Sequence, residues 1–433
     1  MIWNEPVETM PLEDLKNLQS ERLVKLCRYV YEKCPVYRRK FDDHGISPSD
    51  IHSIDDITKL PFTTKLDMRD NYPFGLFSVP RTDLVEIHVS SGTTGNPTLV
   101  GYTRDDIELW SEVMARTLCC AGARTDDTVQ IAYGYGLFTG GLGFHYGALK
   151  MGLTIIPTSS GQTKRQLKIM QDFKPRILCC TPSYCLYMAE EAREMGMDPR
   201  AASWNIGIFG AEPWSESMRT EIEQTWNMLA TDVYGLSEII GPGVSQECHY
   251  KDGLHIYSDV FYPEIIDPES GRPVGEGQDG ELVITTLTKQ GIPLIRYRTR
   301  DIVSMTTQPC RCGRTSPRTS KIKGRTDDMI VVRGINVFPS QIEEVLLGIE
   351  GTHPHYQIVI DRQAHKLDEV EIMVEVDEKI FSDEIKRMHA LEQKIKKEIE
   401  AVLSIGVTVK LVEPKTIQRS EGKAKRVIDK RQL

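Results

Sequence analysis

The sequence has no uninterrupted apolar run of the roughly 18 residues that a membrane-spanning helix needs. Its first residues, MIWNEPVETMPLEDL, contain no basic segment followed by an apolar core, as a secretory signal would. An excess of positive charge is also lacking, because the net charge is −9 and no basic block exceeds the short GKAKR near the end. We therefore expect a soluble, cytoplasmic protein with neither a membrane nor nucleic acid as its partner.

Cysteine is sparse as well. Ten cysteines at irregular spacing are too few for a disulfide scaffold in a chain of this length, so most should be free thiols in a reducing compartment. Seven of them stand in apolar surroundings and are expected in the core. These seven are Cys27, Cys34, Cys119, Cys120, Cys179, Cys180 and Cys185.

What the chain does have is length and a regular alternation of patterns. Its 433 residues suffice for two or three domains. One helix is expected between Thr103, its cap, and Gly122, with Trp110 and Met114 on one face. Short β-rich runs alternate with such helical patterns and predict an α/β fold with a parallel, helix-covered sheet. These runs are LVEIHVS, TVQIAYG, LTIIPT, RILCCTP, IGIFGAE and TDVYG.

The rest of the chain divides into two further regions. Residues from about 245 to 320 read as strands separated by Gly and Pro turns, which predicts a β-rich subdomain within a large domain, 1–326. Residues 327–433 combine strands and helices over about 100 residues and are expected to form a small α+β C-terminal domain. In that domain, Ser340 and Glu343 form a capping-box pattern at the expected start of a helix.

The segment VSSGTTGNPT, residues 89–98, is expected to lie between a strand and a helix. It is not a Walker loop, because no G-K-[ST] follows, and G-x-G-x-x-G is also absent. Its glycines let backbone amides close around an oxyanion, and its hydroxyls add donors, which suits a polyphosphate. The alternative is a flexible surface turn. The candidate phosphate-binding residues are Ser90, Ser91, Gly92, Thr93, Thr94 and Gly95.

Further segments complete a family pattern: YGLSE at 234–238, RYRTRD at 296–301, GRTDDMIVVRG at 324–334 and RSEGKAKR at 419–426. With the loop, they resemble the motifs of the adenylate-forming superfamily. The short length, RYRTRD and RGINVFPSQIEEVL are most similar to its phenylacetate-coenzyme A ligase group. The resemblance covers the chain from about Pro61 onward. One departure is Thr98, which stands where the superfamily loop usually has a lysine.

The resemblance implies that the protein binds ATP with Mg²⁺. Asp301 would accept both ribose hydroxyls, although by itself it could be a salt-bridge partner of the neighbouring arginines. Glu238 would bind Mg²⁺, although a glutamate that ends a loop is usually only solvated. The implied nucleotide-binding residues beyond the loop are Gly210, Ala211, Glu212, Pro213, Asp232, Tyr234, Gly235, Ser237, Asp301 and Arg325.

The resemblance also places the catalytic cation near the end of the chain. Lys423 resembles the family lysine that neutralises the charge developing when a carboxylate attacks the α-phosphate, and Lys425 is the neighbour that could be confused with it. A second step, in which coenzyme A displaces AMP, implies a mobile C-terminal domain that rotates about Asp327, or about Asp328. Gly334 would leave room for the pantetheine arm.

The segment AYGYGLFTGGLGFHYG, residues 132–147, combines five aromatic rings with six glycines. Rings contact a ring and glycines leave it space, so the segment favours an arylacetic or other aromatic acid over a long alkyl chain. The candidate substrate-binding residues are Tyr135, Phe138 and Phe144. The alternative is aromatic core packing against a glycine-rich turn.

Three cysteines and a histidine form a separate pattern. Cys310 and Cys312 make a C-x-C pair, and zinc needs four nitrogen or sulfur ligands. The resemblance to members of the group that have such a pattern implies that Cys248 and His255 are the remaining ligands of a structural Zn²⁺. His249 is the rival fourth ligand, and the alternative is free surface thiols.

Together these features predict an ATP-dependent, AMP-forming ligase that joins phenylacetate or a close relative to coenzyme A. Two alternatives stay open. One is an adenylating enzyme of the same fold that serves a different acceptor, and the other is a nucleotide-binding sensor without catalysis. The sequence does not fix the oligomeric state, for which a homodimer is one option.

Overall fold

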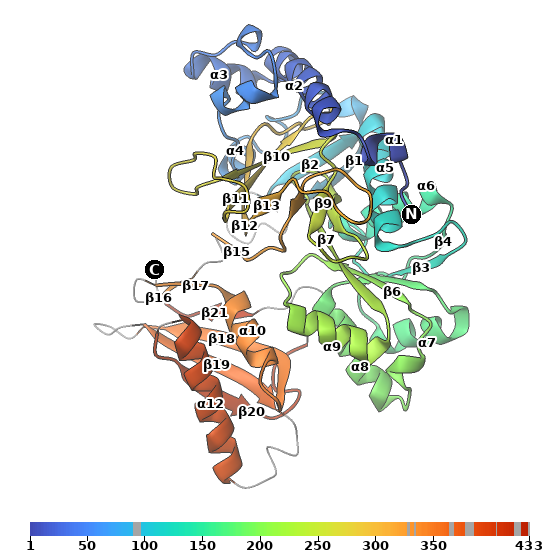
Figure 1. Ribbon diagram of the computed structural model, residues 1–433, viewed down its shortest axis with the longest axis vertical. Coiled ribbons are helices and arrows are strands. Elements are labelled where there is room, and N and C mark those ends of the chain that lie inside the picture. Colours follow the sequence, from blue (N-terminus) through green and yellow to red (C-terminus); the bar gives the residue numbers. More distant parts are fainter. Residues whose placement is uncertain are drawn as a thin grey trace.

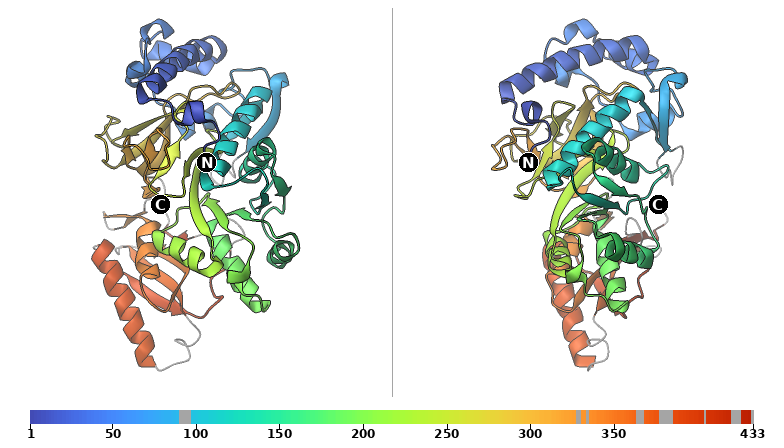
Figure 2. Two further views of the ribbon diagram at one scale, coloured as in Figure 1. Left: turned by 45° about the vertical axis from the view of Figure 1, so that its right-hand side comes forward. Right: turned by 90° about the vertical axis from the view of Figure 1, so that its right-hand side faces the viewer.

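The computed structural model describes residues 1–89, 97–326, 330–332, 335–362, 368–376, 385–403, 405–419 and 426–431. Figure 1 shows two bodies: a large one, coloured blue to gold, and a smaller orange-to-red one formed by the C-terminal residues. In both views of Figure 2 the smaller body again lies below the larger one. No helix among the described residues is both long and apolar enough to cross a membrane.

The centre of the large body is a nine-stranded sheet with the order β13-β14-β9-β8-β7-β6-β5-β3-β4. The strands β4, β3, β5, β6 and β7 pair in parallel, as the alternating pattern predicted, and β8, β9, β14 and β13 continue the sheet antiparallel. Their bounds are β3 Thr128–Ile131, β4 Thr154–Ile156, β5 Ile177–Cys180, β6 Ile206–Gly210, β7 Leu229–Leu236, β8 Gly241–Glu247, β9 Leu254–Ile256, β13 Met305–Thr306 and β14 Arg318–Thr319.

Helices cover both faces of this sheet, and the residues of β5 show how. Ile177 and Cys179 belong to one buried cluster, whereas Leu178 and Cys180 belong to another, because successive side chains of a strand point to opposite faces. The first cluster includes residues of α5 and α6, and the second includes residues of α7, α8 and α9. The bounds are α5 Arg104–Ala121, α6 Gly140–Met151, α7 Thr163–Phe173, α8 Pro182–Glu194 and α9 Glu216–Trp226.

The helix expected after Thr103 is confirmed in detail. The Thr103 hydroxyl accepts a hydrogen bond from the backbone N–H of Asp106 at 3.1 Å, and Trp110 and Met114 are fully buried. Gly122 ends the helix with a φ of 105°, a left-handed conformation that favours glycine. The seven cysteines assigned to the core are all buried.

The first β-rich run was assigned to the wrong sheet. Strand β1 (Leu84–Val89) pairs antiparallel with β2 (Leu99–Thr103) in a separate two-stranded sheet. The glycine-rich segment therefore joins two antiparallel strands and does not lead from a strand directly into a helix. Local pattern identified β1 as a strand, but its pairing partner is a tertiary choice.

The N-terminal helices and a second sheet complete the large body. The helices are α1 Glu5–Glu8, α2 Leu12–Lys33, α3 Pro35–Asp43 and α4 Lys65–Asp70. The second sheet has the order β10-β11-β12-β15, with β10 Phe261–Ile266, β11 Gly280–Thr286, β12 Tyr297–Val303 and β15 Gly324–Arg325. The segment of about 245–320 thus supplies strands to both sheets.

The smaller body has its own sheet, order β20-β19-β18-β21, and its own buried cluster. Helix α10 begins at Pro339, not at the expected cap Ser340. Its N-cap is Phe338, whose N–H donates to the Gln341 side chain at 3.0 Å, while Glu343 is buried. The bounds are β16 Ile330–Val332, β17 Ile335–Val337, α10 Pro339–Leu347, β18 Thr352–Asp361, β19 Glu369–Val376, α12 Ile385–Leu403, β20 Thr408–Val412 and β21 Val427–Asp429.

Candidate active site

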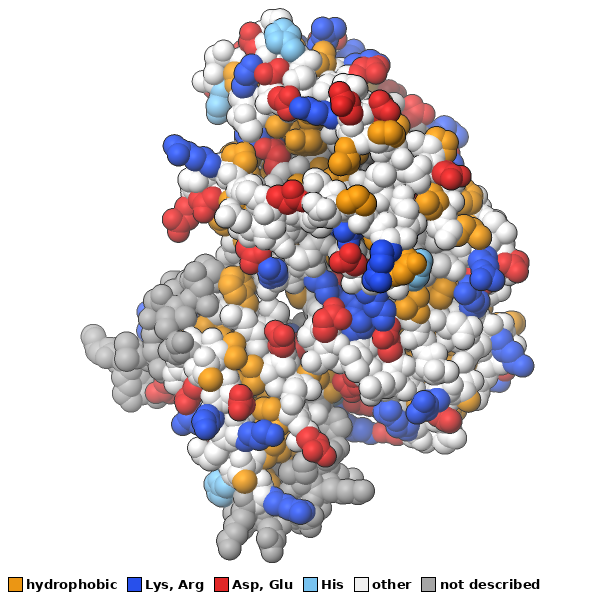
Figure 3. All heavy atoms as spheres, in the orientation of Figure 1, with side chains coloured by type: hydrophobic (Ala, Val, Ile, Leu, Met, Phe, Trp, Pro, Cys, Tyr) orange, Lys and Arg blue, Asp and Glu red, His pale blue; other side chains and the backbone are white. Residues whose placement is uncertain are grey.

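A pocket of about 1680 Å³ lies where the two bodies meet. Its wall in the large body includes residues that follow β6 and the end of β7, which is the carboxyl edge where parallel sheets commonly bind ligands. Residues of the smaller body, among them Ser340, Glu343 and Arg426, line the opposite side. On the face seen in Figure 3, Lys and Arg side chains gather beside Asp and Glu at the junction of the bodies.

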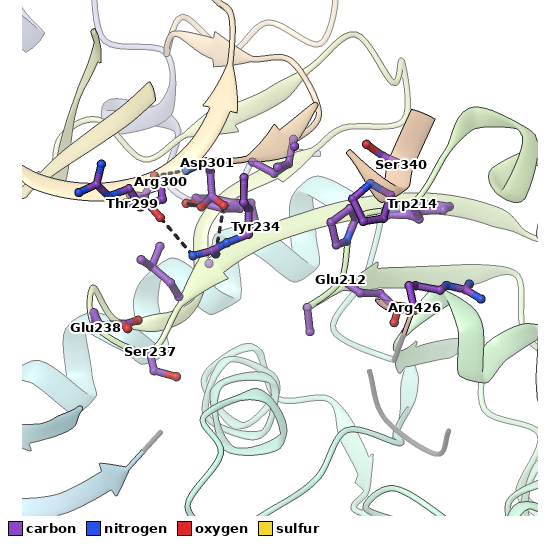
Figure 4. A pocket seen from close by; sticks show the side chains of 18 of the residues that line it. Glu212, Trp214, Tyr234, Ser237, Glu238, Thr299, Arg300, Asp301, Ser340 and Arg426 are labelled. Atoms are coloured by element: carbon purple, nitrogen blue, oxygen red, sulfur yellow. Dashed lines mark hydrogen bonds and ion pairs between the residues drawn. The ribbon is translucent and has the colours of Figure 1, made fainter. Parts of the chain in front are cut away.

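Three predicted residues meet in one hydrogen-bonded group, of which Figure 4 labels Tyr234 and Asp301. Tyr234, on β7, donates its hydroxyl hydrogen to Asp301 Oδ2 at 2.6 Å. Arg325, opposite Asp301 in the β12–β15 pair, places Nη1 3.1 Å from Asp301 Oδ1. Asp301 is only 3% exposed, so both partners fix the carboxylate in place. A carboxylate has about four acceptor positions, which leaves capacity for a ligand hydroxyl.

The segment after β6 forms a second part of the wall. Ala211, with a φ of 70°, is followed by Glu212, whose carboxylate accepts the backbone N–H of Ser183 at 2.8 Å. Ala211, Glu212 and Pro213 line the pocket, but Gly210 does not. A Cβ at Gly210 would lie 2.2 Å from the carbonyl oxygen of Val233, so this glycine permits β6 to approach β7.

Asp232 and the turn after β7 supply acidic groups. Burial raises the pKa of Asp232 to about 6. Glu238 is 8% exposed, and its carboxylate lies 3.9 Å from Lys65 Nζ. Gly235 and Ser237 also line the pocket, and the Ser237 hydroxyl is 3.2 Å from that of Thr139. The Glu238 carboxylate therefore faces the pocket, as a Mg²⁺ ligand must.

The aromatic segment contributes a ring-lined wall. Tyr133 and Phe144 stack with ring centroids 5.3 Å apart, and both line the pocket together with the half-exposed Phe138. Tyr135 is not among the lining residues, because its ring packs edge-on against His145 at 6.0 Å. Two of the three predicted substrate-binding residues therefore reach the pocket.

The sequence analysis did not predict several of the residues that line the pocket. Trp214 lies directly after the predicted AEP stretch, and its ring is flanked by Lys321 Nζ at 4.0 Å and Arg219 Cζ at 4.8 Å from the centroid. Lys65 stands at the start of α4, far from every motif. The aromatic residue beside AEP was a signal for Trp214, whereas nothing in the sequence pointed to Lys65.

Some predicted residues lie outside the described residues. They are Ser90, Ser91, Gly92, Thr93, Thr94, Gly95, Asp327, Gly334 and Lys423. The nearest described neighbours of Lys423, Arg419 and Arg426, are both anchored. Arg426 donates to the carbonyl of Pro354 at 2.8 Å, and its guanidinium lies 4.4 Å from the ring centroid of Tyr356.

A hydrogen bond from a histidine and an arginine ion pair connect the smaller body to α8 of the large one. His355 Nε2 is 2.8 Å from Glu190 Oε1, and Arg419 Nε is 3.1 Å from Glu190 Oε2. The same guanidinium lies 2.8 Å from Glu375 Oε1, within the smaller body. Although burial opposes it, hydrogen bonds from His355 and the charge of Arg419 lower the pKa of Glu190 to about 2.

Away from the pocket, Cys248, His255, Cys310 and Cys312 come together with ligand atoms all within 4.8 Å of one another. The sulfur atoms of Cys248 and Cys310 are 3.8 Å apart, and Cys312 Sγ is 3.3 Å from His255 Nε2. Tetrahedral zinc with Zn–S bonds of about 2.3 Å needs sulfur atoms about 3.8 Å apart, so these residues fit the ion. His249 is not part of this cluster.

The comparisons agree with this geometry. Residues 37–288 match the family described as AMP-binding enzyme, and residues 334–431 match the AMP-binding enzyme C-terminal domain. The chain is 48% identical over 445 residues to a phenylacetate-coenzyme A ligase of Thermus thermophilus, with 100% of each chain covered.

Two solved states of a 2-hydroxyisobutyryl-CoA ligase also match. The postadenylation state, in complex with an adenylate, is 30% identical with a TM-score of 0.94, covering 99% of this chain and 92% of that one. The thioesterification state, with an adenylate and CoA, is 31% identical with a TM-score of 0.74, covering 100% and 93%. The two bodies are therefore arranged as in the former state. The chain belongs to the AMP-binding enzyme family, within its phenylacetate-coenzyme A ligase group.

Proposed function

We propose that this protein ligates phenylacetate, or a closely related aryl acid, to coenzyme A with cleavage of ATP to AMP and pyrophosphate. The observation that carries the proposal is the continuity of one pocket. It holds the Tyr234–Asp301–Arg325 group, the Glu238 carboxylate and the ring wall of Tyr133 and Phe144. A nucleotide and an aromatic acid can thus bind side by side.

The nucleotide end of the pocket is the polar one. Asp301 accepts the ribose hydroxyls, and Arg325 orients that carboxylate. The adenine lies against Tyr234 and the backbone after β6, beside Ala211 and Glu212. Glu238 holds Mg²⁺, which neutralises phosphate charge when bound. This half of the pocket positions the α-phosphate toward the acid.

The other end takes the aromatic acid. Phe138, Phe144 and Tyr133 present ring surfaces, and Gly140 lets the Phe138 ring pack closely, since a Cβ there would lie 2.6 Å from that ring. A ring packed among rings gains burial of about 25 cal/mol per Å² of apolar surface. Flat ring surfaces match a planar aryl group better than a flexible alkyl chain, so an aryl acid is preferred.

The reaction proceeds in two displacements. A carboxylate oxygen attacks the α-phosphorus, the bond to the bridging oxygen breaks, and pyrophosphate leaves. The coenzyme A thiolate then attacks the acyl carbon and releases AMP, which is a better leaving group than oxide. Lys423 provides the cation for the first displacement, and the C-terminal domain rotates about Asp327 before the second, in which Gly334 lines the thiol channel.

A structural Zn²⁺ completes the proposal. Cys248, His255, Cys310 and Cys312 hold it, and the Ser316 hydroxyl, 3.3 Å from His255 Nδ1, orients the imidazole. The hydrogen bond from Cys248 and the neighbouring His255 lower the pKa of Cys312, whereas the same hydrogen bond raises the pKa of Cys248. Zinc binding would require both thiols to lose their protons.

The test separates the two half-reactions. Acid-dependent exchange between pyrophosphate and ATP reports adenylation, and AMP release from pre-made phenylacetyl-adenylate on addition of coenzyme A reports thioester formation. Phenylacetate should support exchange better than octanoate, and coenzyme A should release AMP. Equal exchange with long alkyl acids would refute the aryl site, and AMP release with another acceptor only would refute the ligase.

The role of Lys423 is tested with a matched pair. Lys423→Ala should lose adenylation by about 100-fold or more, as removal of a charge-stabilising group does, while keeping thioester formation. Lys425→Ala, two residues away, should keep both half-reactions. Equal loss of both in Lys423→Ala would remove this role.

A further inference from the structure

Lys289 is a buried lysine that no motif includes. It follows β11 and is only 1% exposed. Its Nζ donates to the backbone carbonyls of Ile239 at 2.7 Å and Glu238 at 3.3 Å, and lies 5.0 Å from the ring centroid of Tyr102. Within the described residues, the structure gives Lys289 no ion pair with a carboxylate. The ammonium group is therefore directed at the main chain of one turn.

Burying an ammonium group without a paired carboxylate is costly. The effective penalty is several kcal/mol even after relaxation, which is why lysine is almost never fully buried. Burial lowers the pKa of Lys289, whereas the nearby carboxylates of Asp106 and Glu238 raise it. An apolar side chain would avoid this penalty. We infer that the N–H donors of this ammonium group have a role at the carbonyls that they bind, those of Glu238 and Ile239.

The surroundings of Lys289 are rigid. Asp106, near the start of α5, accepts the backbone N–H groups of Gln290 at 2.7 Å and Gly291 at 2.8 Å. Asp106 also accepts the N–H of Thr103 at 3.0 Å, so the loop after Lys289 is tied to the first turn of α5. The loop that carries Lys289 is thus anchored to the N-terminal turn of α5.

Tyr102 reinforces the same turn. Its hydroxyl donates to the carbonyl of Ile240 at 3.0 Å and its ring lies beside the lysine. Three consecutive carbonyls, those of Glu238, Ile239 and Ile240, are therefore each bonded to a buried side chain that is itself anchored. Lys289 donates to the first two of these carbonyls, and Tyr102 donates to the third. The backbone from which the Glu238 side chain projects into the pocket is consequently fixed in orientation.

We propose that Lys289 is a positioning residue that sets the direction of the Glu238 carboxylate, so that Glu238 holds the divalent cation bound to ATP. The inference rests on the proposed function, in which Glu238 is the Mg²⁺ ligand. Lys289 acts through the main chain and touches neither nucleotide nor acid. It serves only the adenylation half-reaction, because displacement of AMP by coenzyme A needs no metal–ATP complex.

The test compares Lys289→Met with Lys168→Met. Methionine keeps the length of the side chain but has no donor, and Lys168 is an exposed residue on α7 whose loss leaves the pocket unchanged. The direct readout is Mn²⁺ binding to the complex with a non-hydrolysable ATP analogue, followed by electron paramagnetic resonance. Removal of an outer partner of a metal ligand typically costs 10- to 100-fold in metal affinity.

The expected result has three parts. Lys289→Met should bind Mn²⁺ about tenfold more weakly and need about tenfold more Mg²⁺ for half-maximal pyrophosphate exchange. Its conversion of pre-made phenylacetyl-adenylate by coenzyme A should stay within about twofold of the unmodified protein, since a positioning effect on the metal is confined to the first step. Lys168→Met should match the unmodified protein in all three.

Other outcomes overturn the inference. Unchanged Mn²⁺ affinity, or equal loss of both half-reactions, would leave Lys289 a purely structural residue. If Lys289→Met does not fold, Tyr102→Phe removes only the hydroxyl that holds Ile240, and it should weaken Mn²⁺ binding in the same direction by about twofold, the size of one modest hydrogen bond. No change there would refute the inference.

Failure of the proposed function gives a different pattern. If the unmodified protein shows no acid-dependent pyrophosphate exchange, the proposed reaction is wrong whatever Lys289 does. If Glu238→Gln leaves Mn²⁺ affinity unchanged, the metal ligand is assigned to the wrong residue and the inference falls with it. Weaker binding in both Glu238→Gln and Lys289→Met supports the inference.

Discussion

The pocket is built from two halves that are held in different ways. In the large body, Asp301 is 3% exposed and bonded to Tyr234 at 2.6 Å and to Arg325 at 3.1 Å. At the junction with the smaller body, Glu190 is bonded to His355 and Arg419, and the side chains of these three residues are 25%, 9% and 14% exposed. The first group lies within one body and is the fixed half of the pocket, whereas the second group joins the two bodies.

The physical reason lies in solvation. Breaking one partner out of a buried, bonded group leaves an unsatisfied charge, which is strongly destabilising. The contacts of Glu190 would be exchanged for water only if the smaller body moved away from α8. The proposed rotation of the C-terminal domain between the two displacements would therefore break this second group and leave the first one intact.

The largest effect is expected at the fixed half. Asp301→Asn keeps the shape of the side chain but removes its charge, and hydrogen bonds to a charged group contribute about 1.5–3 kcal/mol. We expect kcat/KM for ATP to fall by about 100-fold in the pyrophosphate exchange assay, which corresponds to about 2.7 kcal/mol. Asp279→Asn, which breaks an exposed ion pair with Lys323, is the control. A loss of less than threefold would contradict the fixed site.

The cluster of Cys248, His255, Cys310 and Cys312 allows a test of the same body without touching the pocket. If it holds the proposed zinc, Cys310→Ser should lose that metal, measured by elemental analysis, and destabilise the protein by at least about 2 kcal/mol in urea unfolding, because metal binding is folding free energy. Cys34→Ser changes another buried cysteine outside the cluster. If both variants were equally destabilised and neither contained zinc, the proposed metal site would be ruled out.

Asp232 tests the cost of a buried charge in the fixed half. Its pKa is raised by burial from 3.8 to about 6, so folding takes up a proton between these values and stability falls as pH rises through this window. Asp232→Asn should therefore increase the free energy of unfolding by about 1–3 kcal/mol at pH 8, and by nothing below pH 4. Denaturant titrations across this pH range measure the free energy of unfolding of both proteins. If Asp232→Asn stabilised the protein equally at every pH, the buried charge of Asp232 would not be the cause.

The smallest effect is expected at the junction. Glu190→Gln removes the charge that faces His355 and Arg419 where the smaller body contacts α8. If these contacts favour the arrangement used by the proposed adenylation step, adenylation should slow and thioester formation should quicken, each by about two- to threefold, because the glutamine amide keeps part of the hydrogen bonding. Glu32→Gln, on an exposed face of α2, is the control. Parallel changes in both half-reactions would show that this contact does not select between arrangements.

Local elements were well predicted, and their partners were not. The helix between Thr103 and Gly122 follows from its cap and its terminal glycine, which act within one turn. The pairing of β1 with β2 and the start of α10 at Pro339 were missed, because strand pairing and caps can involve residues that no local period identifies. The cytoplasmic location and the homodimer stay predictions.

The sequence by itself determined the chemistry that the pocket can perform, since carboxylates, rings and glycines at motif spacing fix which atoms are available. Only the tertiary structure decided which of them meet. Tyr234 and Asp301 are 67 positions apart, and Lys289 stands 51 positions from the Glu238 carbonyl that it holds. Such contacts depend on how strands pair and sheets pack, whereas residue patterns encode only the face that each element buries.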